Sequence, residues 1–169
     1  MNRLNVVLVE PEIPQNTGNI ARTCAATGTR LHLIRPYGFE ISERTVRRAG
    51  LDYWQYLELS EYDSLEDFFL RHPGEEDRFY FFSTKARRLN SEQKFEGDAY
   101  LFFGKETRGL PEDLIRRFYD RSLRLPMLPR IRSLNLSNSV AIACYEVLRQ
   151  WNFEGLQIEG AIPEMKEKN

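Results

Sequence analysis

The sequence predicts an α/β protein with a mostly parallel sheet flanked by helices. Residues 4–9 form an apolar run rich in Val and Leu and broken only by Asn5, which is typical of a parallel strand buried on both faces. A helical segment and a second short strand follow within about 30 residues, as in a strand–helix–strand unit. This alternation continues along the chain, which has 169 residues. We therefore expect one domain over residues 1–153 and a polar tail over residues 154–169.

The first half of the chain predicts alternating elements bounded by Gly, Pro and Ser. Gly28 is a natural residue to end the first helix, and Ser42 is a natural cap for the second. The expected elements are strand 4–9, helix 16–28, strand 31–34, a short basic helix at 42–49, strand 55–59 and helix 64–71.

The second half predicts three further strands and two helices. Pro111 suits the first turn of a helix, and the last helix carries an apolar face that includes Val140, Cys144 and Trp151. The expected elements are strand 78–83, a polar connector at 89–98, strand 100–103, helix 111–118, strand 122–125 and helix 136–151.

The bulk composition bounds the class of protein. With 41% hydrophobic and 29% charged residues, we expect a soluble globular protein with a sizeable core. No apolar run approaches the roughly 20 residues that span a bilayer, and the N-terminus lacks a signal-peptide pattern. The expected location is therefore cytoplasmic, with no membrane partner.

The cysteines and histidines give no sign of a metal or redox site. Cys24 and Cys144 are far apart and lack metal-ligand spacing, so we expect buried apolar roles, no disulfide and no metal. His32 and His72 are isolated in the sequence, so a histidine-based catalytic pair is not expected.

Arginine supplies most of the positive charge, although the net charge is only −1. Guanidinium groups suit phosphate and base recognition better than ammonium groups do. Arginines cluster at 44–48, 87–88, 116–117 and 121–132, beside segments that we expect to be loops. A solvated surface explains each cluster taken singly, whereas several together favour a polyanionic partner.

Three loops after strand ends share a polar and glycine-containing composition. They cover residues 10–19, 104–111 and 125–138. Loops at strand ends are where α/β proteins bind ligands, and glycine lets the backbone approach a ligand closely. Neither glycine loop has a dinucleotide fingerprint or a P-loop ending, so a Rossmann cofactor site finds little support. The third loop is also explained as an ordinary connection with a Ser/Asn helix cap.

The three loops resemble the signature of SPOUT-class RNA 2′-O-methyltransferases. The segments are Asn16-Thr-Gly-Asn-Ile-Ala-Arg22, Leu101-Phe-Phe-Gly-Lys-Glu-Thr-Arg-Gly-Leu-Pro111, and Leu125-Pro-Met with Ser133-Leu-Asn-Leu-Ser-Asn-Ser-Val140. The resemblance covers about residues 4–151 and implies a trefoil knot in the C-terminal part of the fold. Within the class, the Glu10-Pro-Glu-Ile-Pro opening and the segment 48–53 most resemble enzymes that methylate the ribose of the tRNA wobble nucleotide.

The resemblance also implies partners and an activity. The donor would be S-adenosyl-L-methionine, with S-adenosyl-L-homocysteine as the product and no metal. The substrate would be the anticodon stem-loop of a tRNA, with cytidine or a modified uridine at the wobble position, bound by a homodimer. A ribosomal RNA target within the same class, a catalytically idle RNA-binding protein and a small-ligand α/β domain remain as alternatives.

Site residues follow from the resemblance position by position. The expected catalytic residues are Arg22, Asn16, Glu106 and Asn135. The expected donor-binding residues are Phe82, Ser83, Thr84, Gly104, Leu125, Met127, Ser133 and Leu134. The expected substrate-binding residues are Arg48, Arg108, Arg132 and Tyr145.

Several of these assignments have a structural alternative. Arg22 is always protonated, so it suits alkoxide stabilisation and phosphate positioning better than proton abstraction, and a surface ion pair is its alternative. Glu106 is expected to anchor loops, to hold the amino end of the donor or to stabilise the helix that begins near Pro111. Leu125 and Met127 also fit a plain core, Asn135 a helix cap, and Tyr145 interface packing.

Overall fold

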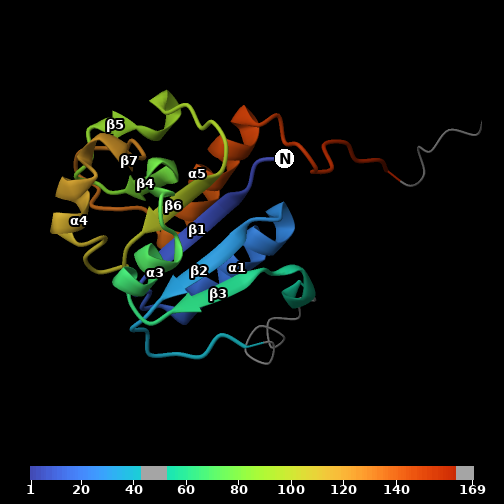
Figure 1. Cartoon of the computed structure of the whole chain (residues 1–169). Coiled ribbons are helices and arrows are strands. Elements are labelled where there is room, and N and C mark those ends of the chain that lie inside the picture. Colours follow the sequence, from blue (N-terminus) through green and yellow to red (C-terminus); the bar gives the residue numbers. More distant parts are fainter. Residues whose placement is uncertain (43–52, 163–169) are drawn as a thin grey trace, which may run out of the picture.

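The computed structural model describes residues 1–42 and 53–162. Its sheet has seven strands in the order β3-β2-β1-β6-β4-β7-β5, and every pairing is parallel (Figure 1). The strands are β1 (Leu4–Val9), β2 (Arg30–Ile34), β3 (Leu59–Tyr62), β4 (Phe79–Phe82), β5 (Arg88–Leu89), β6 (Ala99–Phe103) and β7 (Ser122–Arg124). The predicted mostly parallel α/β fold is confirmed.

Helices cover both faces of the sheet. They are α1 (Pro14–Thr27), α3 (Leu65–Arg71), α4 (Glu112–Arg117) and α5 (Leu136–Gln150), with single turns of 3₁₀ helix at η1 (Trp54–Tyr56), η2 (Glu76–Arg78), η3 (Asn90–Glu92) and η4 (Tyr119–Arg121). Helices α1 and α5 pack against each other on one face, whereas α3 and α4 contribute to the core on the other.

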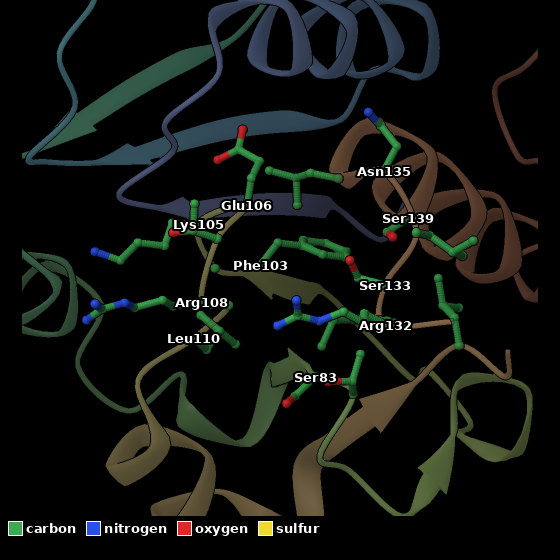
Figure 2. Close-up of a pocket in the computed structure, with 18 of the residues that line it drawn as sticks. Ser83, Phe103, Lys105, Glu106, Arg108, Leu110, Arg132, Ser133, Asn135 and Ser139 are labelled. Atoms are coloured by element: carbon green, nitrogen blue, oxygen red, sulfur yellow. The ribbon is translucent and has the colours of Figure 1, made fainter. Parts of the chain in front are cut away.

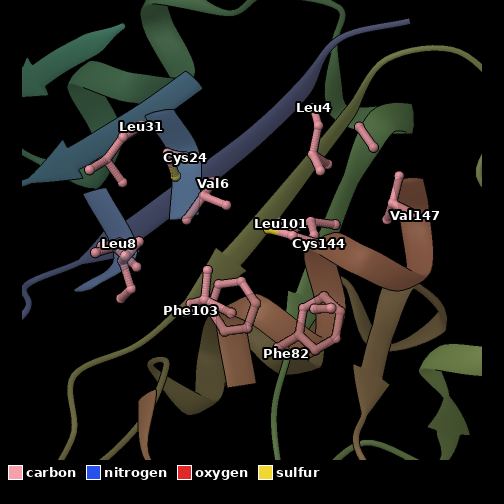
Figure 3. Close-up of a cluster of buried hydrophobic side chains, with 14 of the residues drawn as sticks. Leu4, Val6, Leu8, Cys24, Leu31, Phe82, Leu101, Phe103, Cys144 and Val147 are labelled. Carbon is pink, nitrogen blue, oxygen red and sulfur yellow. The ribbon is translucent and has the colours of Figure 1, made fainter. Parts of the chain in front are cut away.

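Alternate residues of the central strands feed two separate cores. In β1, Val6 and Leu8 face the α1/α5 core, whereas Val7 and Val9 face the α3/α4 core. Figure 3 shows the α1/α5 core, where Cys24 and Cys144 are both buried and unpaired. Because both faces are covered, the central strands are almost entirely apolar, and their buried polar residues Asn5 and His32 are hydrogen-bonded to each other. The predicted buried roles of the two cysteines are confirmed.

The helix ends follow local signals, with one exception. Gly28 ends α1 with φ 65°, Ser64 caps α3 by accepting from the backbone N–H of Asp67, and Pro111 directly precedes α4. Helix α1 begins at Pro14 without a side-chain cap from its N-cap residue, Ile13. The backbone N–H groups of Asn16 and Thr17 donate instead to the Ile13 carbonyl oxygen.

Two strand predictions differ from the structure, and one prediction lies outside it. The strand expected at 55–59 is wrong: η1 occupies 54–56, and β3 begins only at Leu59. The hydroxyl of Tyr53 donates to the carbonyl oxygen of Gly18 at 3.0 Å and fastens this turn to α1. The connector expected at 89–98 contains the end of β5 and all of η3. The basic helix expected at 42–49 falls largely on residues 43–52, outside the described part of the chain.

The two histidines are not isolated in the fold, contrary to the expectation from sequence. The rings of His32 and His72 lie with their centroids 5.7 Å apart, and the Tyr62 hydroxyl bridges them. His32 Nδ1 lies 2.9 Å from that hydroxyl, and His72 Nε2 lies 3.0 Å from it. On the other side, His32 Nε2 lies 3.1 Å from the Asn5 Oδ1 acceptor.

These contacts define one consistent set of proton positions. Asn5 Nδ2 donates to the carbonyl oxygen of Ala99, so Asn5 Oδ1 is free to accept from a protonated His32 Nε2. His32 Nδ1 then accepts from the Tyr62 hydroxyl, whose oxygen accepts from His72 Nε2. Burial lowers the pKa of His32 to about 3, so this ring is neutral at physiological pH. The network is part of the α3/α4 core.

In the described part of the chain, no helix is both long and apolar enough to cross a membrane.

Candidate functional site

The loops after the carboxyl ends of β1, β4, β6 and β7 enclose a cavity of about 690 Å³, which we call the main cavity (Figure 2). These four strands are neighbours in the sheet, so loops distant in sequence meet at one edge. Ligands of open α/β sheets bind at this edge. The cavity volume lies within the roughly 300–1,000 Å³ typical of small-molecule sites.

A tight turn after β6 forms one wall of the main cavity. Gly104 and Gly109 approach so closely that a Cβ on Gly104 would lie 1.9 Å from the Gly109 carbonyl carbon. The backbone N–H of Gly109 donates to the Lys105 carbonyl at 2.8 Å, and Gly109 itself has φ 70°. Only glycine fits the first position, and the second favours glycine strongly. The turn places residues 105–108 between the strand end and the loop after β1.

Glu106 accepts hydrogen bonds from the segment that leads into α1. Its Oε2 accepts from the backbone N–H of Glu12 at 2.8 Å, and its Oε1 accepts from that of Ile13 at 3.1 Å. Oε1 also accepts from Asn16 Nδ2 at 3.2 Å. The two backbone N–H groups belong to the residues directly before Pro14, and a carboxylate beside the helix start complements the helix dipole. The expected anchoring of loops is present, but the helix that Glu106 serves is α1 and not the one after Pro111.

A hydrogen-bonded chain links all three loops. Asn16 is 6% exposed; its Nδ2 donates to Glu106, and its Oδ1 accepts from Asn135 Nδ2 at 3.0 Å. Asn135 Oδ1 accepts from the backbone N–H groups of Ser137 and Asn138 and so caps α5. The helix cap expected as the alternative for Asn135 is therefore present, and the same side chain also bonds across to another loop.

A second set of contacts returns from the β1 loop to the β6 turn. The Glu12 carboxylate accepts from the Thr107 hydroxyl at 2.9 Å and from its backbone N–H at 3.1 Å. Lys105 Nζ forms an ion pair with Glu10 Oε2 at 2.6 Å. Glu10 adopts φ 53°, a conformation uncommon for a residue other than glycine. Each of the two loops thus contributes a carboxylate that accepts hydrogen bonds from the other loop.

Apolar side chains and hydroxyl groups complete the main cavity. The rings of Phe82 and Phe103 are stacked, with centroids 4.7 Å apart and planes at 13°. Leu125 and Met127 line the side that follows β7. Ser83, Ser133 and Ser139 add hydroxyls beside these apolar surfaces (Figure 2). This combination suits a ligand that has both an apolar ring and polar edges.

Most of the predicted site residues lie on the main cavity. All eight predicted donor-binding residues line it, as do Asn16, Glu106, Asn135, Arg108 and Arg132. Arg22 and Tyr145 do not line it: both are exposed, on α1 and α5 respectively. Arg48 lies outside the described residues.

Other lining residues were missed from the sequence. They are Ile13, Lys85, Phe103, Lys105, Thr107, Gly109, Leu110, Leu136 and Ser139. Position was the available signal, because each lies within a few residues of a predicted site residue or strand end. Across residues 1–42 and 53–162, no group of three or more His, Cys, Asp or Glu side chains is placed to hold a metal ion.

Comparisons with known proteins agree with this architecture. A tRNA (cytidine(34)-2′-O)-methyltransferase of Saccharophagus degradans is 48% identical over 153 residues, covering 89% of this chain and 97% of that protein. A solved structure titled "Structural insights into the 2-OH methylation of C/U34 on tRNA" is 45% identical with a TM-score of 0.82, covering 90% of this chain and 92% of that one. The resemblance to the tRNA wobble-nucleotide methyltransferases of the SPOUT class is thereby confirmed.

A more distant structure shares the fold. The SpoU methyltransferase AviRb from Streptomyces viridochromogenes, solved in complex with the cofactor AdoMet, has a TM-score of 0.78 at 21% identity. The alignment covers 91% of this chain and 59% of that one. The model of the SpoU rRNA Methylase family matches residues 3–145. Since this match takes in all three loops of the main cavity, the chain belongs to the SpoU rRNA Methylase family.

Proposed function

We propose that this protein methylates the ribose 2′-hydroxyl of the wobble nucleotide of tRNA, nucleotide 34, with S-adenosyl-L-methionine as the donor. The main support is that all three loops meet in one cavity in a chain 48% identical to a named tRNA (cytidine(34)-2′-O)-methyltransferase. Cytidine and a modified uridine are the proposed bases. The proposed acting form is a homodimer, and a tRNA substrate is in keeping with a cytoplasmic location.

The main cavity fits the proposed donor. When bound, S-adenosyl-L-methionine supplies an electrophilic methyl group on a sulfonium and leaves as S-adenosyl-L-homocysteine. Leu125 and Met127 offer apolar surface to an adenine ring, and the loop backbone around Ser133 and Leu134 offers donors and acceptors to its edge. Gly104 allows the β6 turn to pack without a side chain in the way. No residue of this set has to act as a metal ligand, because the sulfonium already carries its leaving group.

The protein must stabilise charge that develops on the ribose oxygen. The 2′-oxygen forms a bond to the methyl carbon, the carbon–sulfur bond breaks, and the hydroxyl proton passes to water or to a phosphate oxygen. Arg22 is the proposed stabiliser of the alkoxide and the adjacent phosphate, because guanidinium stays protonated in proteins. Asn16, Glu106 and Asn135 hold one another and are proposed to position the loops that carry the donor.

A homodimer reconciles the proposed role of Arg22 with its place on α1. Arg22 is exposed and absent from the lining of its own chain's cavity. We infer that a second protomer places its Arg22 over this cavity. Large apolar side chains are exposed on the loops and helices around the cavity, and these are Ile13, Leu128, Ile131, Leu134, Ile142 and Tyr145. A surface of this kind is typical of subunit interfaces.

The substrate-binding and domain assignments complete the proposal. Arg48, Arg108, Arg132 and Tyr145 are proposed to hold the anticodon stem-loop. Residues 1–153 are proposed to form one domain with the C-terminal trefoil knot of the class, and residues 154–169 a tail.

Methylation assays separate the proposed function from its alternatives. Purified protein is incubated with labelled S-adenosyl-L-methionine and either tRNA or ribosomal RNA transcripts, and the methylated nucleotide is mapped by mass spectrometry. Methyl incorporation at nucleotide 34 of tRNA is expected. Incorporation only into ribosomal RNA would favour the other substrate. Absence of donor binding in calorimetry, with RNA binding retained, would indicate an idle RNA-binding protein.

Mixed dimers test whether Arg22 acts across the subunit interface. Arg22→Ala removes the stabilising charge, and Ser133→Trp fills the main cavity from its exposed rim. Each homodimer is expected to be inactive, although both should remain folded. A mixed dimer should regain about half of wild-type activity at most, because one cavity combines an intact donor site with Arg22 from the partner. No recovery in a verified mixed dimer would contradict action in trans.

A further inference from the structure

A second cavity of about 410 Å³ adjoins the main cavity. Both are lined by Lys85, Lys105, Arg108, Gly109 and Leu110, so they share the β6 turn as a common wall. Glu10, Pro111 and Glu112 line only the second cavity. Figure 2 shows Lys105 and Arg108 extending to the same side, away from Ser133 and Asn135. The donor roles proposed for the main cavity leave the second cavity without an occupant.

The second cavity is rich in charged groups with an excess of positive charge. Lys85, Lys105 and Arg108 provide three cations, and Glu10 and Glu112 provide two carboxylates. Lys105 pairs with Glu10, and Lys85 pairs with Glu112. Among the described residues, Arg108 has no ion pair and is exposed. The guanidinium therefore remains available to an anion.

The two ion pairs differ in how readily they give up a cation. In the Lys85–Glu112 pair the side chains are 56% and 57% exposed, so the pair contributes little to stability. The side chains of the Lys105–Glu10 pair are less exposed, at 31% and 33%. This pair also joins the loop after β1 to the turn after β6, which further hydrogen bonds hold together. An incoming anion would therefore draw Lys85 away from Glu112 more easily than Lys105 away from Glu10.

We propose that the second cavity binds a backbone phosphate of the substrate RNA next to the methylated nucleotide, with Arg108 as the direct ligand and Lys85 released from Glu112. This inference rests on the proposed function for the nature of the substrate. Arginine matches phosphate geometry with paired N–H donors, and a mobile lysine adds a point charge. The shared wall brings this phosphate beside the donor. Glu112 is thus a counter-charge that limits RNA affinity.

The test compares two neighbouring acids of α4. Glu112 lines the second cavity, whereas Asp113 is exposed in the same helical turn and lines neither cavity. Glu112→Gln and Asp113→Asn remove the same charge from the same helix start, so general charge and helix-dipole effects are matched. Binding is measured by fluorescence anisotropy with an anticodon stem-loop already 2′-O-methylated at the wobble nucleotide, so that no turnover intervenes.

Glu112 pairs with Lys85 and also with Arg116 in the next turn of α4, so Glu112→Gln frees both cations. It is expected to tighten RNA binding about two- to five-fold, the range for exposed ion pairs. Asp113→Asn should change it much less, and Lys85→Gln should weaken it. Arg108→Gln should weaken binding and lower the slope of log K against log salt by about 0.7–0.9, as for one lost phosphate contact. These readouts do not require methyl transfer.

Equal effects of Glu112→Gln and Asp113→Asn, or an unchanged salt slope in Arg108→Gln, would overturn the inference. So would a Glu112→Gln effect on S-adenosyl-L-methionine affinity alone, which would assign the cavity to the carboxylate of the donor. Inorganic phosphate, added at matched ionic strength, tests whether the second cavity binds a free anion instead. If it displaces the RNA but RNA affinity is the same in Glu112→Gln and wild type, the proposal of an RNA phosphate in this cavity is also refuted. Failure of the proposed function is distinct, because it appears as absent methyl transfer to tRNA.

Discussion

Glu106 joins the loop after β6 to the start of α1, and its removal should be costly. Glu106→Ala deletes three accepted hydrogen bonds, from the backbone N–H groups of Glu12 and Ile13 and from Asn16 Nδ2. The two backbone groups are near solvent and can bind water. Asn16 is 6% exposed, so its unpaired amide costs about 1–3 kcal/mol. The lost carboxylate at the start of α1 adds about 0.3–1 kcal/mol.

The expected loss in the free energy of unfolding is therefore about 1–4 kcal/mol for Glu106→Ala. Glu106→Gln keeps one neutral acceptor but turns an NH₂ group toward an N–H donor. We therefore expect it to lower the free energy of unfolding by about 1–2 kcal/mol. Urea unfolding at pH 7 measures both, and Glu66→Gln, at an exposed first-turn acid of α3, serves as the control. Donor affinity should fall in the same order. A Glu106→Ala protein within 0.5 kcal/mol of wild type would refute the role assigned to this carboxylate.

Four further substitutions, one of them a control, test the β6 turn, the α5 cap and the His32 network. Gly104→Ala should weaken donor binding at least about ten-fold and lower the melting temperature, because its Cβ would lie 1.9 Å from the Gly109 backbone. Gly18→Ala is the control: a Cβ added there meets no atom within 4 Å, so this substitution should stabilise α1 by about 0.5–1 kcal/mol. Asn135→Ala should cost about 1–2 kcal/mol in urea unfolding from the lost α5 cap, and an unchanged donor affinity would contradict its link to Asn16. His32 has a folded pKa of about 3, below its unfolded value, so the unfolded state binds more protons between these two values. Stability should therefore fall as pH drops from about 6.5 toward 3, by at most about 1.4 kcal/mol per pH unit from this group, and His32→Gln should flatten the slope.

The sequence predicts the sheet well where apolar runs are long and both faces are covered. Strands β1 and β6, and helices α1 and α5, lie within a few residues of their expected bounds. Prediction fails at the two edges of the sheet. Strand β3 has exposed residues Ser60 and Glu61 and no clear periodicity, and β5 has only two residues. Edge strands this short are defined by their partner and not by their own pattern.

In the site, too, features with a local sequence pattern were predicted and features without one were missed. The residues that line the main cavity are recognisable because they belong to three motifs with fixed spacing. The bonds between the motifs, such as Asn16 to Asn135, join positions 119 residues apart and leave no local signal. The pairing of His32 with His72 through Tyr62 was missed for this reason. Arg22 is a third case. Its motif predicts a place in the site, whereas the structure leaves it exposed and away from the main cavity of its own chain.

Methyl transfer to two tRNA transcripts that differ by one oxygen atom tests whether the ribose of nucleotide 34 is the acceptor. One transcript carries ribose at nucleotide 34, and the other carries 2′-deoxyribose only at that position. With S-adenosyl-L-methionine as the donor, we expect one methyl group per tRNA on the first transcript and none on the second. Equal methylation of both transcripts would contradict the claim that the wobble ribose 2′-hydroxyl is the acceptor.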